Sequence, residues 1–140
     1  MANVQQIVPL LNITSMDQSL PFYLERLGFE LKNQWSPEGQ IRWCWLTLGG
    51  ASLMLQQLRK PAAGKLGAGV SFCFQSEDAL AIYRELLGRG VEASEPKVGN
   101  GLWVTLVTDP DGYRLEFASP TDTPEDTLLS SLTNKSLETA

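Results

Sequence analysis

Apolar and polar residues alternate along several short stretches of the chain, which is typical of strands with one buried face. The first such stretch covers residues 5–13 and is rich in β-branched residues. Its alternation predicts two faces, one with Pro9, Leu11 and Ile13 and the other with Val8, Leu10 and Asn12. Segments 29–35, 41–48 and 51–58 are predicted as further strands, and Gly49 and Gly50 as a hairpin turn.

A helical pattern lies between the first two of these strands. Its apolar stripe consists of Met16, Leu20, Tyr23, Leu24 and Leu27. Ser15 and Gln18 have the spacing of a capping box, and Gly28 is placed to end the helix. Pro21 removes one helical hydrogen bond, so we expect a distortion there.

The same order of elements then repeats in the second half of the chain. A strand at 70–75 is followed by a helix capped by Ser76, a short strand at 91–94 and a loop at 95–101. Strands at 102–108 and 113–119 flank the sequence DPDG, which suits a type I turn. The helical sequence FYLERLG also resembles IYRELLG in the second half, which indicates an internal repeat.

These elements predict an α+β protein with two βαβββ modules in one domain, residues 1–119. Module one covers 5–57, a linker covers 58–68 and module two covers 69–119; a polar tail, 120–140, contains a short helix at 124–132 and frays at its end. One helix covers only one face of a four-stranded sheet. The two bare faces are therefore expected to close around a shared cleft.

The net charge of −5 disfavours nucleic acid and anionic membranes as partners, since little would neutralise their phosphates. Cys44 and Cys73 lie in apolar runs and are expected to be reduced packing residues. The chain has no histidine, so a serine or cysteine nucleophile would lack its usual base. With no leader pattern and no apolar run of membrane-spanning length, the expected location is the cytoplasm.

Strand parity also predicts which side chains line the cleft. If Leu115 and Phe117 face a helix, Arg114, Glu116 and Ala118 face the cleft. On the other strands the same parity gives Val8, Leu10, Asn12, Ser52, Met54, Gln56, Ser71, Cys73 and Gln75. The four tryptophans, at 35, 43, 45 and 103, either stack on a flat ligand or pack in the core or in a dimer interface.

Three segments, VPLLNITSMDQSLPFYLERLGFEL, LGGASLMLQ and VTDPDGYRLEF, occur in this order around the linker. They resemble the vicinal oxygen chelate superfamily, which includes glyoxalase I, extradiol dioxygenases, fosfomycin-resistance enzymes and bleomycin-resistance proteins. The likeness covers about residues 5–119. It implies a curved mixed sheet around a cleft, often completed by a partner subunit, so a homodimer is expected.

Metal-dependent members of this family draw ligands from four strand positions, which fall here on Val8, Met54, Ser71 and Glu116. Only Glu116 suits a divalent ion, because a hydrocarbon, a thioether and a serine hydroxyl are poor ligands for it. The resemblance therefore implies the bleomycin-resistance-like branch, whose members bind a compound without a metal or other cofactor.

The sequence thus predicts a metal-free protein, of the antibiotic-resistance type, that sequesters an aromatic and cationic compound. The expected ligand contacts are Asn12, Trp35, Trp43, Trp45, Met54, Gln56, Ser71, Trp103 and Glu116. Competing interpretations are core packing for Met54 and pairing with Arg114, a hydroxyl or water for Glu116. Two other functions stay open: an enzyme (lyase, isomerase or oxygenase) with Glu116 as base or with an unrecognised metal site, and a scaffold without a ligand.

Overall fold

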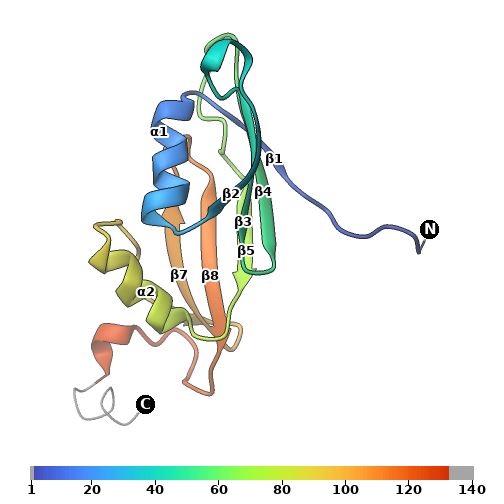
Figure 1. The fold of residues 1–140 in the computed structure, drawn as a ribbon. Coiled ribbons are helices and arrows are strands. Elements are labelled where there is room, and N and C mark those ends of the chain that lie inside the picture. The colour runs from blue at the N-terminus through green and yellow to red at the C-terminus, as the bar shows by residue number, and fades with distance from the viewer. Residues whose placement is uncertain (1, 133–140) are drawn as a thin grey trace. The chain divides into compact units, whose positions relative to one another are not determined.

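The computed structural model describes residues 2–132 and contains two compact units, Met1–Leu66 and Gly67–Ala140. Each unit has its own four-stranded sheet and its own helical segment (Figure 1). The two mixed sheets confirm the predicted α+β class and the two βαβββ modules. The boundary between the units falls within the predicted linker, 58–68. Among the described helices, none is long and apolar enough to cross a membrane.

The sheet of the first unit has the strand order β1-β4-β3-β2. Its strands are β1 (Leu10–Ile13), β2 (Glu30–Trp35), β3 (Trp43–Leu48) and β4 (Ala51–Gln57). Strand β1 runs parallel to β4, whereas the other neighbours are antiparallel. The predicted first strand began at residue 5 and was too long, because pairing with β4 starts only at Leu10.

The helical segment of the first unit changes type at the proline. Helix α1 (Met16–Pro21) is α-helical, and η1 (Phe22–Arg26) continues it as a π-helix. The predicted distortion at Pro21 is thus confirmed, since proline has no N–H to donate to the preceding turn. As expected, the Gln18 N–H donates to Ser15 Oγ at 3.3 Å, and Gly28 follows the helix with a φ of 88°.

One face of this sheet is buried and supplies the core of the unit. Its side chains are Leu11, Ile13, Cys44, Leu46, Leu53 and Leu55, and all six are at most 2% exposed. Met16, Tyr23 and Leu27 of the predicted helical stripe are buried as well. Burial of each large aliphatic side chain contributes about 1.5–3 kcal/mol to folding. The predicted parity of Leu53 and Leu55 is therefore confirmed.

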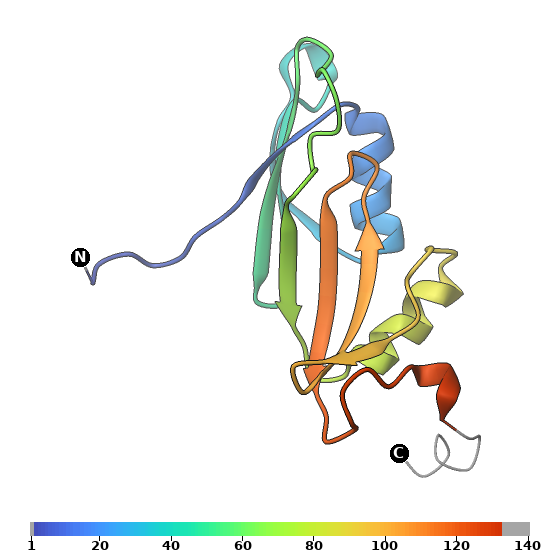
Figure 2. The same cartoon turned by 180° about the vertical axis from the view of Figure 1, so that it is seen from behind.

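The sheet of the second unit has the order β5-β8-β7-β6, and Figure 2 shows β8 between β5 and β7. Its elements are β5 (Ser71–Gln75), α2 (Ala79–Gly88), β6 (Lys97–Gly99), β7 (Leu102–Thr108) and β8 (Arg114–Pro120). Helix α2 packs on β7 and β8. The buried side chains of Leu115 and Phe117 confirm the parity predicted for β8. The Gly112 N–H donates to the Asp109 carbonyl at 3.1 Å, and Asp111 does not have the positive φ of a type II turn, which agrees with the predicted type I turn.

Three local predictions in the second unit were wrong. Helix α2 is capped by Asp78, whose Oδ1 accepts from the Ala81 N–H, whereas the Ser76 hydroxyl donates to the Phe74 carbonyl. Residues 91–94 form a single bridge, Ala93 to Val107, because the Ser94 side chain takes the Leu106 N–H that a strand would use. The strand that pairs with β7 at this edge is instead β6, which lies in the segment 95–101 that was predicted as a loop.

The C-terminal tail forms less helix than predicted. Within 124–132 the only helical segment is the 3-10 turn η3 (Leu129–Ser131). Leu129 and Leu132 pack against a core cluster of the second unit. The predicted fraying concerns residues 133–140, which lie outside the described part of the chain.

Candidate functional site

The open face of the first unit's sheet carries a row of four predicted site residues. Trp35 pairs with Trp43, Trp43 pairs with Gln56, and Gln56 pairs with Asn12 of the parallel strand. Side chains directly opposite each other on neighbouring strands project from the same face. A second row, one step along the strands, consists of Asn33, Trp45, Met54 and Leu10. The register thus brings together all six site residues predicted in this unit.

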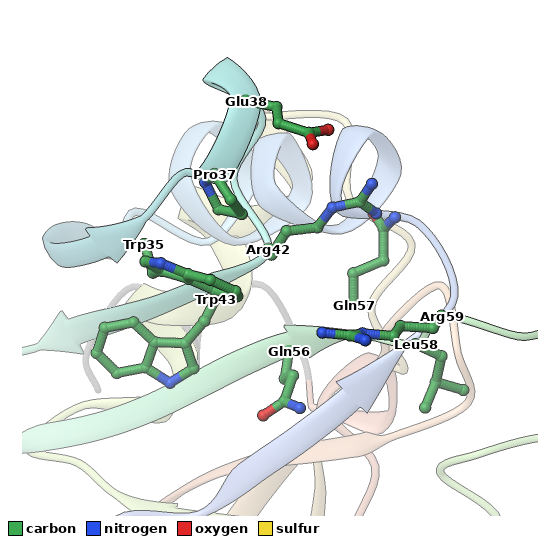
Figure 3. A pocket seen from close by; sticks show the side chains of 9 residues that line it. All are labelled: Trp35, Pro37, Glu38, Arg42, Trp43, Gln56, Gln57, Leu58 and Arg59. Carbon is green, nitrogen blue, oxygen red and sulfur yellow. The ribbon is translucent and has the colours of Figure 1, made fainter.

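A pocket of about 700 Å³ lies at one end of this sheet. It is lined by Trp35, Pro37, Glu38, Arg42, Trp43, Gln56, Gln57, Leu58 and Arg59. In Figure 3 the two indoles form one end of the pocket, and Arg42, Gln57 and Arg59 lie toward the other end. The pocket therefore has an aromatic end and a cationic end.

Backbone hydrogen bonds define the end of the sheet where this pocket forms. Strand β2 ends at Trp35, and the 3-10 turn η2 (Pro37–Gly39) carries the chain back toward β3. The Arg42 N–H donates to the Trp35 carbonyl, and the Gln57 N–H donates to the Arg42 carbonyl, both at 2.9 Å. The three segments that line the pocket are thereby tied to one another. Glu38 has a φ of 58°, which a short turn into Gly39 requires.

Gln57 has a structural role beside its place in the pocket. Its Oε1 accepts a hydrogen bond of 2.8 Å from the Met16 N–H, the first residue of α1. This bond satisfies a donor that the start of a helix leaves without an intrahelical partner. Gln56, by contrast, belongs to the open face with the tryptophans.

Trp45 lies beside this pocket without lining it. The ammonium nitrogen of Lys32 is 5.3 Å from the centroid of the Trp45 ring, which is cation–π distance. The indole Nε1 of Trp45 is buried and has no hydrogen-bond partner among the described residues. The open face therefore presents the positive charge of Lys32 next to the Trp35–Trp43 pair, whereas the Trp45 Nε1 donor is buried.

The open face of the second unit's sheet holds the other predicted polar residues. Cys73 is paired with Glu116, and Ser71 with Arg114. The Cys73 thiol donates to Glu116 Oε2 at 3.5 Å, and Arg114 Nη2 lies 4.0 Å from Glu116 Oε1. The pKa of Cys73 is raised by its partial burial and, to a smaller extent, by Glu116. Glu116 thus has a cation and a thiol as neighbours, which agrees with the competing interpretation for this residue.

The structure does not bring Trp103 to an open face. Its side chain is only 6% exposed and belongs to a core cluster with Ala79 and Val98. Trp103 lies on the same face of β7 as Thr105 and Val107, which are also buried. Nearness to a loop suggested a ligand contact, but strand parity places this indole in the core.

The sequence interpretation missed the charged residues of the pocket. Arg42 and Arg59 lie just outside the ends of β3 and β4, where strand parity no longer applies. Glu38 belongs to the turn η2, which was treated only as a connection. The sequence did contain a signal for this cationic end of the pocket, since Arg42 and Arg59 are basic residues close to the ends of two adjacent strands.

Comparison with known proteins identifies the family. Residues 4–117 match the family model of the Glyoxalase/Bleomycin resistance protein/Dioxygenase superfamily, and the chain belongs to this superfamily. TioX from Micromonospora sp. ML1 has a similar structure, with a TM-score of 0.69 and 23% identity over 84% of this chain and 99% of TioX. None of the curated proteins compared with the chain is a match.

Two further solved structures share the fold. TnmS3, an antibiotic binding protein from Streptomyces sp. CB03234, has a TM-score of 0.68 and 21% identity over 86% of this chain and 99% of its own. A putative glyoxalase family protein from Bacillus anthracis has a TM-score of 0.67 and 19% identity over 84% of this chain and 97% of its own. At these identities the comparison shows a common fold.

The side chains at the family's metal-ligand positions do not fit a divalent ion. Val8, Met54 and Ser71 offer a hydrocarbon, a thioether and a hydroxyl. The fourth, Glu116, already has the Arg114 guanidinium beside it, which opposes a second cation. Within residues 2–132, no three His, Cys, Asp or Glu side chains form a group that could hold a metal ion.

Proposed function

We propose that this protein binds a small molecule with a flat aromatic part, without a metal, and thereby sequesters it. The observation that carries this proposal is the Trp35–Trp43 pair at one end of a pocket of about 700 Å³. Ligand pockets of roughly 300–1,000 Å³ commonly combine aromatic walls with a few polar groups. Trp35 is exposed and Trp43 is half-buried, and indoles held on a sheet supply a stacking surface that loses little side-chain entropy on binding.

The similar structures support a binding role. TnmS3 is described as an antibiotic binding protein, and it shares the fold over most of its length. Resistance by sequestration of an antibiotic is therefore our preferred biological role. The homodimer, the cytoplasmic location and the lack of a nucleic-acid partner stay predictions from the sequence.

The predicted cationic group of the ligand also stays a prediction. Its expected partner was Glu116, a residue of the second unit. That carboxylate already has Arg114 within 4.0 Å, so a ligand cation would compete with it.

An enzyme that uses Glu116 as base, or an unrecognised metal site, is the alternative. The thiol and the guanidinium beside Glu116 offer no obvious substrate-activating partner. Metal analysis of protein purified without a chelator tests the metal-dependent form of this alternative. A stoichiometric divalent ion, lost together with an activity on dialysis, would favour the enzyme.

The binding proposal is tested by titration of planar aromatic compounds, with tryptophan fluorescence and calorimetry as readouts. We expect Trp43→Ala to weaken binding about two- to tenfold, because stacking on one indole contributes roughly 0.5–1.5 kcal/mol. Leu87→Ala is the control, since this exposed apolar side chain lies on α2, in the second unit. The proposal fails if no compound binds, or if Trp43→Ala binds as well as the control.

A further inference from the structure

We propose that the pocket of the first unit selects aromatic compounds that carry an anionic group, such as a carboxylate, and that Arg42 and Arg59 hold this group. The inference rests on the proposed binding function and specifies the ligand class. It differs from the cationic ligand predicted from the sequence.

The first argument is the charge of the pocket. Arg42 and Arg59 supply two cations, and Glu38 is the one acid among the lining residues. Neither Arg42 nor Arg59 forms an ion pair with another described residue. The chain as a whole is acidic, with a net charge of −5, whereas the charged residues that line this pocket are mostly basic.

The second argument is the geometry of the donors. Arg42 lies just before β3 and Arg59 lies beyond the end of β4, and Figure 3 shows the guanidinium of Arg59 extended above Gln56. A guanidinium presents its N–H groups as a planar fork that matches a carboxylate. The Gln56 amide adds a further donor beside that fork. An anionic group would thus replace water on several donors at once.

The third argument is the arrangement of the aromatic end. Trp35 and Trp43 lie opposite the arginines in the pocket, so a flat ring against them directs its substituent toward the cationic end (Figure 3). Lys32 over Trp45 adds another positive charge on the same sheet. A cationic substituent would meet repulsion there, whereas an anionic one would be attracted.

The test compares three probes with one ring system: 2-naphthoate, 2-naphthamide and 2-naphthylmethylammonium. Calorimetry on the wild-type chain should show 2-naphthoate binding about tenfold more tightly than the amide, and the ammonium compound most weakly. Added salt should reduce the advantage of the carboxylate, because Arg42 is only half-buried and Arg59 is exposed to solvent.

The double variant Arg42→Gln/Arg59→Gln should abolish this preference and leave binding of the amide within about twofold. The matched control is Lys60→Gln/Lys65→Gln, which removes the same charge from linker positions that do not line the pocket. It should keep the preference. Circular dichroism checks that both variants fold.

The outcomes separate the two proposals. Equal binding of the three probes, or tightest binding of the ammonium compound, overturns the anion selectivity and leaves the binding function standing. A preference that survives in the arginine variant, or disappears in the lysine control, also overturns it. If none of the probes and none of the larger planar compounds binds, the proposed function itself fails.

Discussion

Cys73 Sγ lies 3.5 Å from Glu116 Oε2 across the parallel pair β5–β8, on the open face of the second unit's sheet. Cys44, the other cysteine, is fully buried in the core of the first unit. Partial burial of the Cys73 thiol and the nearby carboxylate both disfavour the thiolate, so the pKa of Cys73 is raised. The exposed thiol is therefore less reactive than its accessibility alone would predict.

Glu116→Gln should increase the reactivity of Cys73. Removal of the carboxylate charge lowers the pKa of the thiol, although its partial burial still keeps this pKa above the ordinary value. We expect alkylation by iodoacetamide near neutral pH to accelerate about two- to tenfold. Mass spectrometry across a pH series measures the rate at Cys73. The exposed acid Glu77 provides the control Glu77→Gln, and an unchanged pH profile in Glu116→Gln would contradict the prediction.

The stability of the protein should fall at alkaline pH because of Cys44. Burial raises the pKa of this thiol from 9.0 to about 11. Between these two values the unfolded state releases the proton while the folded state retains it, so the free energy of unfolding decreases as the pH rises. We expect a loss of about 1 kcal/mol between pH 8 and pH 10.

Urea unfolding of the wild type and of Cys44→Ala measures this effect. We expect the variant to be less stable at both pH values, because it leaves a cavity in the core. The informative quantity is the loss of unfolding free energy between pH 8 and pH 10. This loss should be about 1 kcal/mol smaller in the variant than in the wild type. Equal pH dependence in the two proteins would refute the assignment to Cys44.

The regular parts of the fold were predictable because local rules and tertiary packing agree there. The alternation of apolar and polar residues predicted β7 with its observed bounds. Strand parity correctly assigned Leu53, Leu55, Leu115 and Phe117 to the buried faces of the sheets. The failures occurred where one side chain replaces a backbone interaction. Ser94 accepts the Leu106 N–H and shortens the predicted strand, and Asp78 takes the cap predicted for Ser76.

The candidate site was predictable only in part. Parity identified the open face with Trp43, Gln56 and Met54, because side chains along a strand alternate strictly. It could not identify Arg42 and Arg59, whose positions depend on how a turn and two strand ends meet. It also could not show that Trp103 contacts the core cluster beside α2.

Asp109 of the DPDG sequence should be a determinant of stability. Its carboxylate is buried, and its Oδ1 accepts hydrogen bonds of 2.9 Å from the N–H groups of both Asp111 and Tyr113. Asp109→Ala leaves these two donors without their acceptor and should cost about 2–3 kcal/mol of unfolding free energy.

Asp109→Asn retains a side-chain carbonyl as acceptor and should be less harmful than the alanine variant. Asp122→Ala is the control, because this exposed acid lies outside the turn. Thermal or urea unfolding gives the comparison. A loss no greater than that of Asp122→Ala would show that the carboxylate does not hold the turn.

The N-terminal segment should be covered by a second copy of the chain. Val4 is 76% exposed and Ile7 is 89% exposed, although both are large apolar residues. Contiguous exposed apolar surface marks interaction sites, and most soluble oligomers are homodimers. Light scattering at micromolar concentration should therefore give twice the mass of the chain.

The double variant Val4→Lys/Ile7→Lys should shift this equilibrium toward the monomer, because lysine side chains in an apolar interface are costly to desolvate. Leu87→Lys is the control, since it changes an exposed apolar residue on α2. Circular dichroism establishes whether the monomer stays folded. A wild-type chain that is monomeric at these concentrations, or a dimer that persists in the double variant, would show that this segment does not form the interface.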